Sequence, residues 1–175
     1  ILLKYQKAFV GKVYTEENND HDILMDVFGI TPDLKRENRQ YWGRELGMCW
    51  ELLIMEVARL NCADFQPREK TDADSPMDFF IGKDAIDTKY RVGSGDSGTL
   101  KKFKKYGKLL KEQGYNPVLL ILREDNLPAA ITAFNVGGWE IFSGKKCLEY
   151  IESKTSFNIE KFLLESKQEF KINRS

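Results

Sequence analysis

The pattern of apolar and polar positions predicts helices that alternate with strands. Apolar residues recur at intervals of three and four between Tyr41 and Leu60, as in a long amphipathic helix. The continuous apolar run from Val118 to Leu122 indicates a strand that is buried on both faces. Further helices are predicted near Ile1 to Tyr14, Lys145 to Ser153 and Ile159 to Phe170.

A β-hairpin is predicted between the long helix and the buried strand. Two strand-like segments, Met77 to Ile81 and Asp84 to Arg91, flank the turn residues Gly82 and Lys83. A loop with three glycines then leads to a basic helix from about Thr99 to Glu112. We expect the hairpin to form part of the central sheet.

Shorter signals complete the predicted order of elements. Thr31 followed by Pro32 is typical of a helix start. Residues 61–75 are predicted to be a polar loop, and residues 131–134 and 139–142 to be short strands. The order favours an α/β fold, a sandwich with a central mixed β-sheet flanked by helices.

No repeat or linker divides the chain, so we expect one domain over residues 1–175. It has an N-terminal helical part to about residue 60, a core from about 43 to 142, and C-terminal helices from about 145 to 170. With 42% hydrophobic and 31% charged residues, the chain can bury a core. Its longest apolar run is far shorter than the roughly 20 residues of a membrane-spanning helix. It begins at Ile1 without a secretory leader, so we expect a cytoplasmic protein with no membrane partner.

The cysteines and the histidine limit the possible chemistry. Three cysteines without CxxC spacing favour reduced thiols over a disulfide framework or a zinc site. His21 is the single histidine, which excludes any mechanism that needs two imidazoles. We therefore expect carboxylates and lysines to carry any catalysis.

Charge is unevenly distributed although the net charge is zero. Residues 77–112 carry 9 basic and 5 acidic side chains, whereas residues 1–76 carry 10 and 14. The basic excess in the middle of the chain indicates contact with a polyanion.

Two aspartates are predicted to oppose each other across the hairpin. If Gly82 and Lys83 form the turn, Asp78 pairs with Asp87, and directly opposed Cβ atoms lie about 5 Å apart. Like charges at that distance repel, and a divalent cation would compensate them. Lys89 projects from the same face as Asp87 because side chains alternate along a strand. Hard oxygen ligands favour Mg²⁺, with Mn²⁺ as a substitute.

Such a site suits phosphodiester hydrolysis. The metal can lower the pKa of a bound water, and the lysine can orient or deprotonate that water and neutralise the phosphate. Asp-x-Lys at the end of a strand is also common in proteins without this activity. The opposed aspartate, the glycine loop and the lysine-rich helix favour a nuclease.

The segments Ser75-Pro76-Met77-Asp78 and Asp87-Thr88-Lys89 resemble the PD-(D/E)xK motif of restriction-endonuclease-like nucleases. Met77 departs from the pattern because it separates the proline from the aspartate, although the metal ligand is kept. The resemblance implies a restriction-endonuclease-like fold and a metal held by Asp78 and Asp87. Many members add an acid from the preceding helix. Glu51 is favoured, four residues after Gly47, and Glu45 and Glu56 stay open, as does a solvated role for each.

A more specific resemblance, to ApaLI-type type II restriction endonucleases, covers about Gly43 to Phe142. It lies mainly in Asp87 to Gly107 and in Asn126 to Ile131. It implies a prokaryotic, cytoplasmic homodimer that cuts both strands of a short palindrome in double-stranded DNA and leaves 5′-phosphates. It also implies a cognate methyltransferase that acts on the same site.

Two segments are predicted to bind DNA. The loop after the second hairpin strand carries side chains that suit base edges: Arg91, Ser94, Asp96 and Ser97. The basic helix carries lysines that suit phosphates: Lys101, Lys102, Lys104, Lys105 and Lys108. A plain connector and a solvated helix are the respective alternatives.

Two other functions stay open at this stage. A structure-selective repair or junction nuclease would share the same site, and a DNA-binding module would keep the fold without catalysis. The presence of Asp78, Asp87 and Lys89 together favours hydrolysis.

Overall fold

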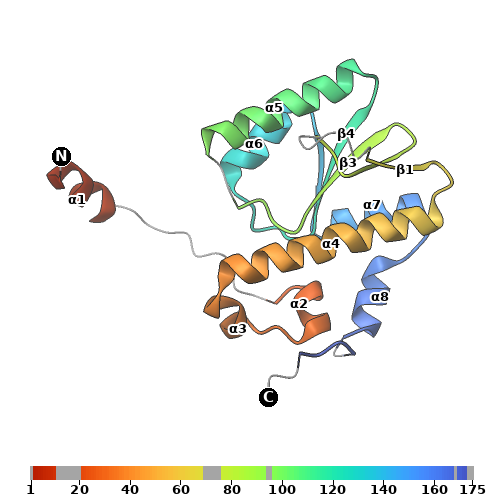
Figure 1. Cartoon of the computed structure of the whole chain (residues 1–175), viewed down its shortest axis with the longest axis horizontal. Coiled ribbons are helices and arrows are strands. Elements are labelled where there is room, and N and C mark those ends of the chain that lie inside the picture. Colours follow the sequence, from red (N-terminus) through yellow and green to blue (C-terminus); the bar gives the residue numbers. More distant parts are fainter. Residues whose placement is uncertain (1, 11–20, 69–75, 94–95, 168, 173–175) are drawn as a thin grey trace.

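The computed structural model describes residues 2–10, 21–68, 76–93, 96–167 and 169–172 (Figure 1). Helices flank one mixed sheet, as predicted. In chain order the elements are α1 (Leu2–Val10), α2 (Ile23–Phe28), α3 (Pro32–Glu37), α4 (Arg39–Asn61), β1 (Phe65–Pro67), β2 (Phe79–Ile81), β3 (Asp84–Lys89), α5 (Ser97–Glu112), β4 (Asn116–Ile121), α6 (Pro128–Gly137), β5 (Glu140–Ser143), α7 (Lys145–Thr155) and α8 (Ile159–Glu165).

The sheet has the strand order β1-β2-β3-β4-β5. β1, β2 and β3 are antiparallel neighbours, whereas β3, β4 and β5 are parallel. The predicted hairpin register is confirmed at three pairs, from Ile81 opposite Asp84 to Phe79 opposite Ile86. Gly82 adopts φ 57° in the turn, a left-handed conformation that glycine tolerates. Parallel neighbours need crossovers, which α5 and α6 supply.

Each face of the sheet packs on its own helices. Val118 and Leu120 of β4 join the core beneath α4 and α7, whereas Leu119 and Ile121 join the core beneath α5 and α6. This alternation follows from the two-residue period of a strand. The prediction that this strand is buried on both faces is confirmed. In Figure 1, α4 runs across the middle of the molecule, and α5 and α6 lie above it.

Three details of the predicted order are wrong. Residues 131–134 lie in helix α6 and form no strand, because Pro128 starts the helix and Gly138 ends it in a left-handed conformation. The predicted loop 61–75 contains strand β1, which pairs with β2 at the sheet edge. The last predicted helix ends at Glu165 and does not reach Phe170. Residues 11–14 of the first predicted helix lie outside the described residues.

Within the described ranges, no helix combines the length and the apolar character needed to cross a membrane.

Helices α5 and α6 approach closely because glycines lie at their contact. A Cβ atom at Gly107 would collide with the carbonyl oxygen of Gly137 and with the indole of Trp139. The Trp139 indole N–H donates to the carbonyl oxygen of Phe103 at 3.0 Å. This contact fixes α5 against the sheet.

We expect Gly107→Ala to lower the free energy of unfolding by about 1–3 kcal/mol, because the added methyl group overpacks the contact. Urea unfolding followed by circular dichroism measures the change. Lys108→Ala, at the exposed neighbouring position, is the control and is expected to leave stability unchanged. Equal free energies of unfolding for the two variants would show that α5 and α6 can move apart without lowering the stability of the fold.

Candidate active site

The hairpin brings Asp78 to Asp87 in a way that differs from the predicted strand register. Regular pairing ends at Phe79, and the Asp78 N–H donates to the carbonyl oxygen of Ile86 at 2.8 Å. The Asp78 carboxylate then turns toward β3, where it accepts hydrogen bonds from the Thr88 N–H at 2.7 Å and the Thr88 hydroxyl at 2.8 Å. Thr88 therefore fixes Asp78 beside the segment that carries Asp87.

Lys89 lies against Asp87, as the alternation along the strand predicts. Its Nζ donates to Asp87 Oδ1 at 2.5 Å and to the carbonyl oxygen of Thr88 at 3.2 Å. The Asp87 side chain is 11% exposed and that of Lys89 is 37% exposed. Lys89 is thus partly exposed as a side chain, while its ammonium group is held on a buried carboxylate.

Burial and charge shift the pKa values of this pair. Burial is the main cause that raises the pKa of Asp87; Lys89 lowers it, Asp78 raises it, and together these effects bring it to about 7. Burial by itself lowers the pKa of Lys89, but the carboxylates of Asp87 and Asp78 outweigh this effect and raise it overall. Perturbed groups of this kind cluster at functional sites.

Asp84, at the other end of β3, shows the opposite behaviour. Its carboxylate accepts hydrogen bonds from Lys154 at 2.5 Å, Tyr150 at 2.8 Å and Asn116 at 3.0 Å. Although burial raises its pKa, these three donors lower it overall. Asp84 is fully compensated by its neighbours, whereas Asp87 is not.

Among the three helix acids, Glu51 is the one directed at the hairpin. It is half-buried on α4, and burial together with the charge of Asp78 raises its pKa, while Lys89 and Arg68 lower it. Glu45 instead pairs with Arg44 at 2.9 Å, and Glu56 pairs with Arg59 at 2.5 Å. The structure therefore brings Glu51 into the electrostatic environment of Asp78 and Lys89.

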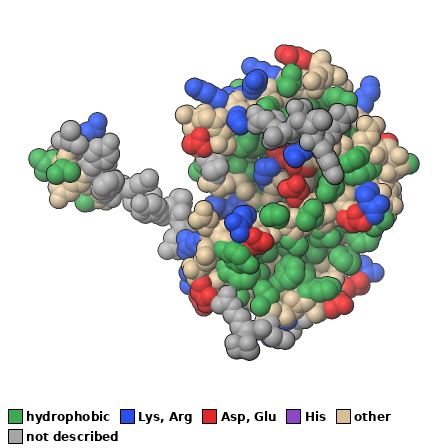
Figure 2. Space-filling model, in the orientation of Figure 1, with side chains coloured by type: hydrophobic (Ala, Val, Ile, Leu, Met, Phe, Trp, Pro, Cys, Tyr) green, Lys and Arg blue, Asp and Glu red, His purple; other side chains and the backbone are tan. Residues whose placement is uncertain are grey.

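A cavity of about 710 Å³ opens between α4 and the end of β3. Figure 2 shows acidic and basic side chains side by side in the hollowed middle of this face. One wall is formed by Thr88, Lys89, Tyr90, Arg91 and Gly93, and the other by Arg39, Gln40, Gly43, Arg44, Gly47 and Glu51 of α4. Of the α4 wall, the sequence pointed to Glu51 and, through its spacing, to Gly47, but not to the other four residues. Two glycines inside a long helix, beside arginines, were the available signal.

The predicted DNA-binding residues are divided between several places. Arg91 lines the cavity, whereas Asp96 caps α5 by accepting from the Gly98 and Thr99 N–H groups at 3.0 Å each. Ser97 is exposed at the first turn of α5, and Ser94 lies outside the described residues. The five predicted lysines are exposed along α5, and the described lining of the cavity includes none of them: Lys101, Lys102, Lys104, Lys105 and Lys108.

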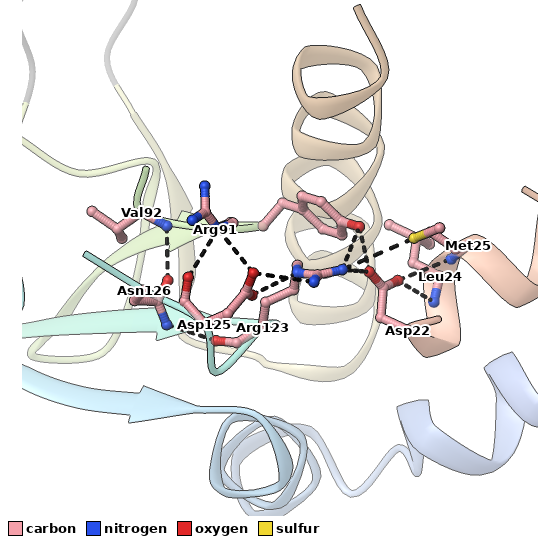
Figure 3. A network of polar contacts seen from close by, with 9 residues as sticks. Asp22, Leu24, Met25, Arg91, Val92, Arg123, Asp125 and Asn126 are labelled. Carbon is pink, nitrogen blue, oxygen red and sulfur yellow. Dashed lines mark hydrogen bonds and ion pairs between the residues drawn. The ribbon is translucent and has the colours of Figure 1, made fainter. Parts of the chain in front are cut away.

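A buried ion network holds the cavity edge in place (Figure 3). Arg123 is 4% exposed and pairs with Asp22 at 2.6 Å and with Asp125 at 2.7 Å. Asp125 also accepts from Arg91 at 3.1 Å, and Tyr90 donates to Asp22. Asp22 caps α2 as well, through the Met25 N–H at 2.9 Å. The network joins α2 to the segments that follow β3 and β4.

The donor chemistry of the hairpin acids fits a divalent metal ion. Among the described residues, no three His, Cys, Asp or Glu side chains gather closely enough to hold one. However, the charge of Asp78 raises the pKa of Asp87, with which it interacts directly. It also raises the pKa of Glu51. A hard cation would relieve this repulsion through carboxylate oxygens, the ligands that Mg²⁺ prefers.

Comparison with known proteins gives one match. A family model described as ApaLI-like restriction endonuclease matches residues 55–168, about two thirds of the chain. The match includes the hairpin with Asp78, Asp87 and Lys89, and Glu51 lies just before it. No curated protein and no solved structure matches the chain.

We expect the Asp87 carboxyl to titrate near pH 7, which carbon-detected NMR of labelled aspartate measures. Asp78→Asn should lower this pKa, because it removes a neighbouring negative charge, and Lys89→Ala should raise it. The pKa of Asp87 in the folded chain lies above the usual value of about 4. The favourable contribution of its protonation to the free energy of unfolding is therefore fully present at low pH. This contribution is lost as the pH rises from about 4 to 7. Titration of Asp87 near pH 4 would contradict the assigned environment.

We expect Arg123→Met to lower the free energy of unfolding by about 3–5 kcal/mol, because it removes the arginine that pairs with the largely buried Asp22 and leaves Asp125 with Arg91 alone. Chemical denaturation measures this loss. Arg36→Met is the control, because Arg36 pairs with Asp33 on the exposed surface and should matter little. If both variants unfold like the parent chain, the network does not hold these segments together.

Proposed function

The chain belongs to the ApaLI-like restriction endonuclease family, and on that premise we propose that it is a metal-dependent type II site-specific endodeoxyribonuclease. The family makes the chain a nuclease, a hydrolase whose substrate is DNA. The observation that carries the finer proposal is the bond of Lys89 to Asp87, with Asp78 held on Thr88 between them, where Lys89 and Glu51 line the same cavity.

The proposed reaction is hydrolysis of a phosphodiester bond. The oxygen of a water molecule attacks phosphorus, a new P–O bond forms, and the bond from phosphorus to the 3′ oxygen breaks. The water loses a proton and the leaving oxygen gains one, so the products are a 5′-phosphate and a 3′-hydroxyl. Transition-state charge on the phosphoryl oxygens must be offset by cations or hydrogen-bond donors.

We assign Lys89 to orientation and charge stabilisation. Its raised pKa supports a protonated ammonium at neutral pH, which donates hydrogen bonds and does not remove a proton from water. Asp87 holds Nζ at 2.5 Å, and Lys89 lines the cavity. The ammonium would orient the attacking water and neutralise a phosphate oxygen.

Although the three acids do not gather closely in the described chain, we assign Asp78, Asp87 and Glu51 to hold the metal, which we propose to be Mg²⁺ with Mn²⁺ as a substitute. When bound, such an ion lowers the pKa of a water ligand and polarises the phosphate. The hydrogen bonds from Thr88 keep the Asp78 carboxylate pointed at β3, where it meets Asp87. Thr88 is therefore a positioning residue.

For DNA contacts we retain the sequence-based assignment. Arg91, Ser94, Asp96 and Ser97 would contact base edges, and a phosphate-binding group on α5 would supply affinity without sequence selectivity. That group is Lys101, Lys102, Lys104, Lys105 and Lys108. The exposure of these lysines and the position of Arg91 on the cavity support the assignment.

Cutting both strands of a palindrome requires two sites related by a two-fold axis, so we propose a homodimer. Exposed apolar side chains support an interface: Met48 and Leu52 on α4, and Phe162 and Leu164 on α8. In the cell, we expect the enzyme to act in the prokaryotic cytoplasm alongside a methyltransferase that protects the same site.

We expect the chain to cut linear phage DNA into discrete bands in Mg²⁺ and to leave the DNA intact in EDTA. Lys89→Ala should reduce the cleavage rate by at least about 100-fold, because charge stabilisation in the transition state is lost. Lys83→Ala is the matched control, since Lys83 is exposed in the turn of the same hairpin. Sequencing of the ends identifies the site and the 5′-phosphate.

The helix acids provide a second arm of this experiment. Glu51→Gln is expected to slow cleavage strongly, whereas Glu45→Gln and Glu56→Gln, on the same helix, retain the parent rate. DNA binding without cleavage under any condition would replace the proposal with a DNA-binding module. Selective cutting of branched DNA would replace it with a junction nuclease.

A further inference from the structure

The α4 wall of the cavity has features that the proposed catalytic groups do not explain. Its residues recur at four-residue intervals, so they occupy one face of the helix. This face comprises Arg39, Gln40, Gly43, Arg44, Gly47 and Glu51, and we call it the α4 face. It lies opposite Lys89 and Arg91 across a cavity of about 710 Å³.

Packing against the described residues does not explain the two glycines of the α4 face. A Cβ atom at Gly43 or Gly47 would meet no described heavy atom within 4 Å. At Gly107 and Gly137, by contrast, a Cβ atom would collide with the neighbouring helix. Glycine weakens the interior of a helix relative to alanine. Two such positions in α4, both facing the cavity, indicate that a surface outside the described chain approaches the helix backbone there.

The charges on the α4 face indicate what approaches it. Arg44 is 67% exposed, and its described partners, Glu45 and the Tyr41 ring, both lie on α4, so its guanidinium can turn toward the cavity without breaking a described contact to another element. Arg39 and Gln40 are also exposed and line the same cavity. Guanidinium groups bind phosphate oxygens with two parallel hydrogen bonds.

We propose that the α4 face is a docking surface for the sugar–phosphate backbone of the DNA strand that enters the cavity. Gly43 and Gly47 let that backbone lie close to the helix, and Arg39 and Arg44 bind its phosphates. This inference rests on the proposed nuclease function, because it takes the cavity beside Lys89 as the place where DNA lies. It adds a second contact surface to the lysines of α5.

The test measures binding and stability in the same variants. Binding of a fluorescein-labelled phage DNA fragment is followed by anisotropy across a series of KCl concentrations, in EDTA so that cleavage does not interfere. Gly47→Ala and Gly47→Leu, with the same changes at Gly43, should weaken binding progressively, by about tenfold or more for leucine. The melting temperature should rise by about 2–4 °C, because alanine and leucine favour the helix.

The arginine arm has a matched control on the same helix. Arg44→Ala should weaken binding and reduce the slope of log K against log salt by about one, as expected for one lost phosphate contact. Arg59→Ala also removes an exposed arginine that pairs with a nearby glutamate, but it lies outside the cavity lining and should change neither value.

Unchanged DNA affinity in the leucine variants, or a lower melting temperature in the alanine variants, would overturn the inference. The first result would mean that nothing approaches the α4 face, and the second that the glycines serve packing. Failure of the proposed function gives a different result, because the parent chain would then leave DNA uncut in Mg²⁺. The binding measurements would still test whether DNA contacts the α4 face.

Discussion

A carboxylate can lie in a strand buried on both faces only if neighbouring groups compensate its charge. β3 carries two such acids, Asp84 and Asp87, and their charges are compensated to different extents. Asp84 receives hydrogen bonds from Lys154, Tyr150 and Asn116, which lower its pKa and anchor β3 to α7 and β4. Asp87 has Lys89 as its cation, and its pKa is raised to about 7. The charge of Asp84, at one end of β3, is thus balanced by its partners. The charge of Asp87, at the end that meets the cavity, is not fully balanced.

The end of β3 near the cavity is held in place by the buried ion pairs and hydrogen bonds around Arg123, which we call the Arg123 network. Arg123 follows β4, Tyr90 and Arg91 follow β3, and Asp22 precedes α2. These ion pairs and hydrogen bonds join residues up to 101 positions apart in sequence. Because a buried ion without its partner is costly, the segments at the cavity edge are held as one unit. The position of Arg91 beside the cavity is therefore set by elements far from the hairpin.

The sequence was informative wherever local periodicity determines geometry. Alternation along β3 predicted that Lys89 lies on the side of Asp87, and the turn signal predicted the hairpin register. The strand predicted at Ile131 was wrong, because a short apolar run fits a buried helix equally well. The turn of Asp78 toward Thr88 was missed because it depends on a break in strand pairing. The Arg123 network was missed because contacts between distant segments leave no periodic signal.

Apart from Glu51, which α4 contributes to the proposed metal site, the proposed catalytic groups lie on the hairpin, and the DNA contacts proposed for the α4 face lie across the cavity from them. The family match over residues 55–168 contains the hairpin, where Asp87 and Thr88 are buried and fixed by sheet packing. The α4 face precedes that range, and a Cβ atom added at either of its glycines would meet no described heavy atom within 4 Å. A substitution in β3 must therefore preserve the core, whereas one on the α4 face can change contact with a ligand and leave the sheet intact. The catalytic groups on β3 and the arginines and glycines of the α4 face can thus vary independently within one fold, whereas Glu51 belongs to both sets.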